Sequence, residues 1–113
     1  MAKEFKSNVG GKVSRKEAME WIDKYEREMR KDKDKDARSV FFGRDVLLRI
    51  LSEDGTTGIT FMFGLKYNEA VKRDTLQLIM LPTREDGSFI WQDESSRGDA
   101  IAFDGGLGCP PYC

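Results

Sequence analysis

The spacing of the apolar residues changes at Gly58, and this change restricts the chain to a fold that contains both helices and strands. Upstream, Ala18, Trp21, Tyr25 and Met29 recur at steps of three or four, which is the spacing of one face of a helix. Downstream, apolar residues alternate with other residues, as in a half-buried strand. Because the helical signals come first, we predict an α+β domain in which two helices pack on a small, mainly antiparallel β-sheet.

Two helices are predicted from their start signals and their apolar stripes. Ser14 begins a capping-box pattern, so we expect a helix over residues 14–30. Its Trp21 and Tyr25 lie on the apolar stripe, and we expect them in the core rather than on a ligand platform. A second, shorter helix is predicted over residues 46–51, whose apolar residues again follow the helical period.

Two longer strands and one short strand are predicted in the second half of the chain. Residues 58–67 alternate, so their odd-numbered apolar side chains share one face. Residues 75–81 carry apolar side chains on both faces toward their end, and we therefore expect this strand at the centre of the sheet. Polar residues between these strands favour a hairpin loop, and a turn at 85–87 precedes the short strand at 88–92.

The chain of 113 residues has the length of a single domain. We divide it into a lead-in at 1–13, a folded core at 14–92 and an irregular carboxyl-terminal arm at 93–113. Residues 30–36 alternate in charge without an apolar residue, so we expect a solvated, mobile loop there. A basic patch for nucleic acid is the alternative, but the interleaved aspartates cancel most of its field.

The composition argues against several classes of function. A net charge of −1 is too small for a domain held to nucleic acid through its phosphates. The sequence contains no histidine, the commonest general base and transition-metal ligand, so we expect neither an enzyme nor a bound cofactor. Residues 10–14 are similar to a phosphate loop but lack its spacing. We find no secretory signal and no run that approaches a membrane span, and we predict a cytoplasmic protein without a membrane partner.

Both cysteines lie in the last five residues, at Cys109 and Cys113, separated by two prolines and a tyrosine. One interpretation is a rigid arm whose thiols have no chemical role, and this is the interpretation we favour. The alternatives are a small disulfide loop, which a reducing cytoplasm opposes, a metal clip completed by a second chain, and a redox-active thiol pair.

Two short stretches carry a resemblance to a known group of sequences. These are Ser39-Val40-Phe41-Phe42-Gly43-Arg44-Asp45 and the terminal Cys109-Pro110-Pro111-Tyr112-Cys113. With them, the chain resembles a group of short uncharacterised bacterial proteins that share such a segment and such an end. The resemblance implies no activity and no site residues.

These observations favour a non-enzymatic protein-interaction module, such as a regulatory or immunity-type partner protein. The alternative is a thiol redox or metal-binding protein that uses Cys109 and Cys113. The apolar positions left over once helices cover the odd-numbered face of the sheet are the candidates for a partner surface. The interaction candidates are Leu48, Met62, Ile79, Leu81 and Tyr112.

Two further expectations concern assembly and the arm. We expect a homodimer, because the even-numbered face of the sheet needs cover and symmetric pairing is a common way to obtain it. We also expect Tyr112 and the two prolines to pack onto the folded domain and to hold Cys109 and Cys113 near one another.

Overall fold

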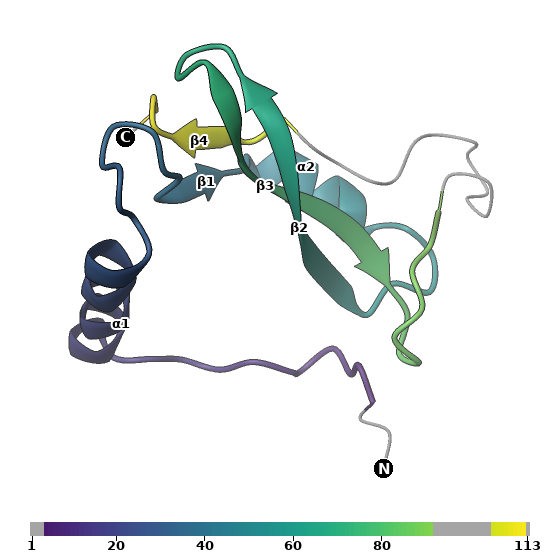
Figure 1. Ribbon diagram of the computed structural model, residues 1–113. Coiled ribbons are helices and arrows are strands. Elements are labelled where there is room, and N and C mark those ends of the chain that lie inside the picture. Colours follow the sequence, from purple (N-terminus) through teal and green to yellow (C-terminus); the bar gives the residue numbers. More distant parts are fainter. Residues whose placement is uncertain (1–3, 92–104, 113) are drawn as a thin grey trace.

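The computed structural model describes residues 4–91 and 105–112, and it shows an α+β fold of two helices and two small antiparallel sheets (Figure 1). The fold class is therefore as predicted. The sheets have two strands each, and they join β2 to β3 and β1 to β4. In chain order the elements are α1 (Arg15–Glu28), β1 (Ser39–Phe41), α2 (Arg44–Leu51), β2 (Gly58–Asn68), β3 (Arg73–Thr83) and β4 (Leu107–Cys109).

Both helices form where the sequence predicts them. Ser14 is the N-cap of α1, and its hydroxyl accepts a hydrogen bond of 3.1 Å from the backbone N–H of Glu17. Helix α2 begins after Gly43 and contributes Ile50 to the core. None of the side chains of α1 is buried, so the expectation that Trp21 and Tyr25 lie in the core is wrong.

The β2–β3 hairpin is the largest element of the fold. Its strands pair without a break from Gly58 opposite Thr83 to Asn68 opposite Arg73, which confirms the predicted antiparallel pairing. The turn between them is closed by the backbone N–H of Lys72, which donates to the Asn68 carbonyl over 2.8 Å. Two strands in one sheet leave no central strand, so the central position predicted for 75–81 is wrong.

The region after β3 forms less strand than the sequence predicts. The expected strand at 88–92 is reduced, among its described residues, to one isolated bridge between Phe89 and Thr83. The chain turns back there because Ser88 donates from its backbone and its hydroxyl to the Asp86 carboxylate. The Ile90 N–H then donates to the Pro82 carbonyl over 3.0 Å, which holds the buried Ile90 against the base of the hairpin.

Strands β1 and β4 form a short pair that the sequence does not predict. Ser39 lies opposite Cys109, and the Arg38 N–H extends the pair by donating to the Cys109 carbonyl over 2.6 Å. The approach of the two segments is close at Gly106, where a Cβ atom would lie 2.5 Å from Val40 Cγ1. Glycine is required here because any side chain would collide with β1.

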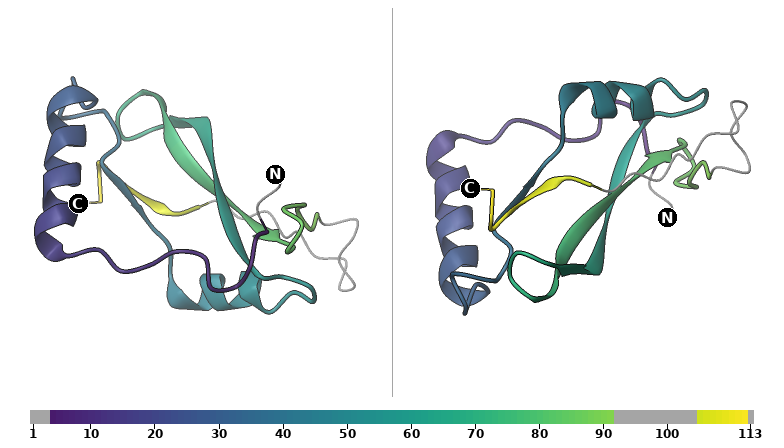
Figure 2. Two further views of the ribbon diagram at one scale, coloured as in Figure 1. Left: turned by 90° about the horizontal axis from the view of Figure 1, so that it is seen from below. Right: turned by 90° about the horizontal axis from the view of Figure 1, so that it is seen from above.

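The amino-terminal segment, predicted only as a lead-in, is attached to the base of the hairpin. The backbone N–H of Phe5 donates to the Glu85 carbonyl over 2.7 Å, and the Thr57 hydroxyl donates to the Phe5 carbonyl over 2.6 Å. The Phe5 ring lies over Gly87, where a Cβ atom would be 2.6 Å away and φ is +88°. From there the segment crosses to α1 (Figures 1 and 2).

The charged run at 30–36 is organised around one buried side chain, which corrects the expectation of a solvated, mobile loop. Arg30 is only 7% exposed. Its guanidinium donates to the carbonyls of Asp36 and Lys33 over 2.9 and 2.7 Å, and to the carboxylate of Glu26. The Asp36 carboxylate in turn pairs with Arg73 at the start of β3. The run therefore connects α1 to the hairpin.

Candidate protein-interaction surface

One face of the β2–β3 hairpin is almost entirely apolar. Residues that lie directly opposite in an antiparallel pair project from the same face. The register therefore places the odd-numbered residues of β2 beside the even-numbered residues of β3, and Asp74 is the only charged member of this set. We call it the apolar sheet face: Ile59, Phe61, Phe63, Leu65 and Tyr67 with Pro82, Met80, Leu78, Leu76 and Asp74.

The β2 half of the apolar sheet face is exposed. Phe63 is 77% and Leu65 is 76% accessible, and Phe61 and Tyr67 are also exposed. Solvated faces of antiparallel sheets normally carry polar side chains, so this row is an exception. The sequence analysis noted the alternation of these residues but assigned them to a helix-covered face. No signal in their own segment distinguishes the two assignments.

The opposite face of the hairpin is the more polar one and is turned toward the rest of the molecule. Near the hairpin loop, Lys66 and Gln77 line a cavity of about 350 Å³ together with Gly106 and Gly108, which lie next to or within β4. At the base, the hydroxyls of Thr60 and Thr83 are hydrogen-bonded over 2.6 Å. Figure 1 shows α2 and the β1–β4 pair on this side, behind the hairpin.

The five predicted interaction residues do not form one surface. Met62 and Ile79 lie directly opposite each other on the inner, polar face, where Met62 is exposed and Ile79 is half-buried. Leu81 is 2% exposed and cannot contact a partner. Leu48 is exposed on α2, and Tyr112 is exposed in the arm. The face that needs cover is therefore the odd-numbered face of β2 rather than the even-numbered one.

The apolar stripe of α1 extends the apolar sheet face. Trp21, Ile22 and Met29 are exposed along this helix. Tyr25 and Met29 line a cavity of about 220 Å³ together with Leu65 of the apolar sheet face. The two apolar surfaces therefore meet at this cavity, and Figure 2 shows α1 at the side of the hairpin.

An ionic network fixes the position of α1. The Glu26 carboxylate accepts from Arg30 and from Arg38, the latter over 2.9 Å. The hydrogen bond from Arg30, followed by the charges of Arg30, Arg38 and Lys33, holds the pKa of Glu26 below its ordinary value despite partial burial. The pKa of Asp36 is also lowered, first by the backbone N–H of Asp32 and then by Arg73. These charges anchor the helix whose apolar stripe stays exposed.

The arm docks through Cys109 rather than through Tyr112. Cys109 is 1% exposed and disulfide-bonded, and the second cysteine of the sequence, Cys113, lies outside the described residues. The peptide bonds that precede Pro110 and Pro111 are cis. Tyr112 is 63% exposed, so its predicted packing onto the domain is wrong, although its N–H donates to the Gly108 carbonyl over 2.9 Å. A disulfide sulfur is neither a thiolate nucleophile nor a thiolate ligand.

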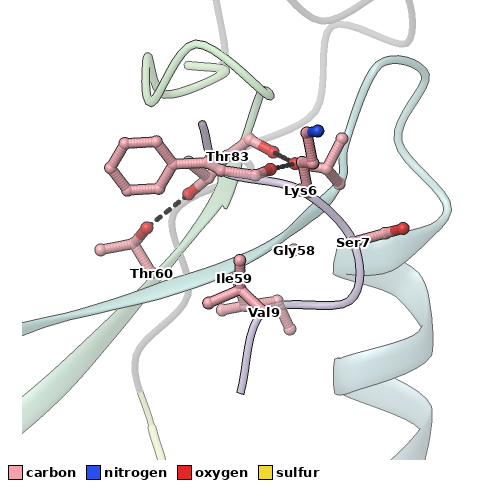
Figure 3. Close-up of a pocket in the computed structure, with 9 residues that line it drawn as sticks. Lys6, Ser7, Val9, Gly58, Ile59, Thr60 and Thr83 are labelled. Atoms are coloured by element: carbon pink, nitrogen blue, oxygen red, sulfur yellow. Dashed lines mark hydrogen bonds between the residues drawn. The ribbon is translucent and has the colours of Figure 1, made fainter. Parts of the chain in front are cut away.

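A further cavity, of about 190 Å³, lies between the amino-terminal segment and the base of the hairpin (Figure 3). Its polar groups are Lys6, Ser7 and the threonine hydroxyls of Thr57, Thr60 and Thr83. The threonines are already hydrogen-bonded to one another or to backbone carbonyls. In the described part of the chain, no group of three or more cysteine, aspartate or glutamate residues is placed to hold a metal ion.

Comparison with protein-family models, with curated proteins and with solved structures finds no match to the chain. None of the helices in the described ranges is both long enough and apolar enough to cross a membrane.

Proposed function

We propose that the protein is a non-enzymatic protein-interaction module, of the regulatory or immunity type, and that it binds its partner through the apolar sheet face and the stripe of α1. The observation that carries this proposal is the row of exposed Phe61, Phe63, Leu65 and Tyr67 along one strand. Large contiguous apolar patches on a folded protein mark interaction sites, and aromatic residues are enriched at the centres of interfaces.

The rigidity of the platform supports the same proposal. Strand β2 pairs along its whole length with β3, so the four exposed side chains are presented from regular secondary structure. Preorganised surfaces lose less conformational entropy on association than flexible loops do. The network around Arg30 gives α1 a similar fixed position beside the strand.

The burial of Cys109 argues against the alternative function in thiol redox or metal chemistry. Thiol–disulfide exchange requires access of an attacking thiolate to one sulfur, and Cys109 is enclosed by its pairing with β1. Its disulfide also argues against the predicted cytoplasmic location, because the cytoplasm keeps most thiols reduced. We therefore keep the interaction function and leave the compartment as a prediction.

The proposal is tested by substituting the two most exposed residues of the apolar sheet face together, Phe63→Ser and Leu65→Ser. Full-length wild type, this double variant and the control Leu48→Ser are used as baits in the source organism. We expect the double variant to lose the specific partner, with affinity reduced roughly 30-fold or more if both residues are central contacts. Leu48→Ser should retain it. Equal binding by all three proteins would contradict the proposed surface.

A further inference from the structure

We infer that the occupant of the apolar sheet face is a second copy of this chain, and that two hairpins pack face to face about a two-fold axis near Phe63. This inference rests on the proposed function, because it names the partner of the same surface. Closed two-fold dimers use one patch on both subunits, so the patch must be complementary to itself. Three observations bear on this requirement: the accessible area, the charge distribution and the position of Phe63 in β2.

The accessible area of the chain exceeds that of a compact monomer. It measures 8479 Å², whereas a folded protein of 12.9 kDa exposes about 6,300 Å². The radius of gyration is 16.0 Å, against about 13 Å for a compact domain of this length. A standard interface takes about 800 Å² from each partner, so the excess of about 2,200 Å² leaves ample area for one. The amino-terminal segment contributes part of this excess.

The apolar sheet face can lie against a copy of itself without like-charge repulsion. Its only charged residue, Asp74, lies opposite Tyr67 at the end of the face nearest the hairpin loop. With an axis near Phe63, this end of one copy faces the Ile59 end of the other. Lys6 lies there, in the same cavity as Ile59, and its present partner is the exposed Glu4. Each Asp74 would therefore approach a cation of the other copy.

The position of Phe63 suits a symmetric contact. It is near the middle of the eleven residues of β2, and it is the most accessible residue of the apolar sheet face. Two sheets that pack face to face lie about 10 Å apart with their side chains interdigitated. An antiparallel arrangement would place Phe61 of one copy near Leu65 of the other. The stripe of α1, continuous with Leu65 at the 220 Å³ cavity, would form a side wall of the interface.

Sedimentation velocity of the full chain, from low micromolar to tens of micromolar, tests the inference. We expect a dimer for the wild type and for Leu48→Ser, and a dissociation constant raised roughly tenfold or more in the Phe63→Ser, Leu65→Ser variant. Far-ultraviolet circular dichroism checks that the variant stays folded. A wild type that is monomeric throughout, or a dimer that the double variant leaves intact, overturns the inference.

A second measurement does not depend on the tolerance of the polar substitutions. Phe63→Cys places a thiol near the proposed axis, so mild oxidation should link two chains covalently, whereas Leu48→Cys should remain unlinked. A dimer in which only the Leu48→Cys variant links overturns the inference. A monomer that still captures another protein through Phe63 and Leu65 overturns the second-copy occupant while the proposed function stands. A monomer whose captured protein is unaffected by these residues overturns both.

Discussion

Arg30 shows how a single residue can convert a charged run into ordered structure. Its five N–H donors are held in a plane, and here they serve two backbone carbonyls and one carboxylate. The carbonyls of Lys33 and Asp36 are thereby satisfied although their segment belongs to neither helix nor sheet. The alternating sequence around Arg30 gives no hint of this, because the guanidinium reaches across the turn to its partners.

We predict that Arg30→Ala lowers the free energy of unfolding by about 2 kcal/mol, because two backbone carbonyls lose a charged donor. The neighbouring Lys31→Ala is the control, since Lys31 is exposed and its substitution should change stability by less than about 0.5 kcal/mol. Urea unfolding of both variants provides the comparison. Equal stabilities would mean that Arg30 does not organise the loop.

At the scale of elements, the pairing of β1 with β4 attaches the arm to the body of the molecule. Each strand has three residues, so their pairing alone contributes little. The buried Cys109 and the close contact at Gly106 add the packing that the short strands lack. This small element therefore depends on the absence of a side chain at one position.

We predict that Gly106→Ala separates β4 from β1. The new Cβ atom would lie 2.5 Å from Val40 and 2.7 Å from the Phe42 ring, and such overpacking costs about 1 to 3 kcal/mol. Gly108→Ala is the matched control, because the nearest atom to its Cβ would be 3.7 Å away, an ordinary contact. The Arg38 amide, which donates to Cys109, should exchange with solvent faster in Gly106→Ala only.

At the scale of the whole molecule, α1 is held to the hairpin by charges rather than by apolar packing. The helix has no buried side chain, and its link to β3 runs through Glu26, Arg30, Asp36 and Arg73. The stability of this arrangement must therefore respond to pH. Two carboxyl groups in the network, Glu26 and Asp36, have lowered pKa values.

We predict that acid weakens the attachment of α1. A carboxyl whose pKa is lower in the folded than in the unfolded state stabilises the fold above its unfolded value, and this contribution is lost as the pH falls through the folded value. The ordinary values are 4.5 for Glu26 and 3.8 for Asp36, so stability should decline as the pH falls below about 4.5. Urea midpoints measured from pH 7 to pH 3 should show a shallower decline for Glu26→Gln, measured against its own value at pH 7. An identical decline in both proteins would argue against this role of Glu26.

The sequence by itself determined the local elements: α1, α2 and the β2–β3 hairpin. Their signals, the Ser14 cap and the change from helical to strand period, act between residues that are close in the chain. Alternation defines two faces of a strand but does not say which face turns inward, so the exposed row at Phe63 was assigned to the wrong side. The pairing of β1 with β4 joins residues about seventy positions apart, and no local pattern encodes it. Tertiary structure decided both, because each depends on which distant segment lies nearby, and it thereby decided where the candidate interaction surface lies.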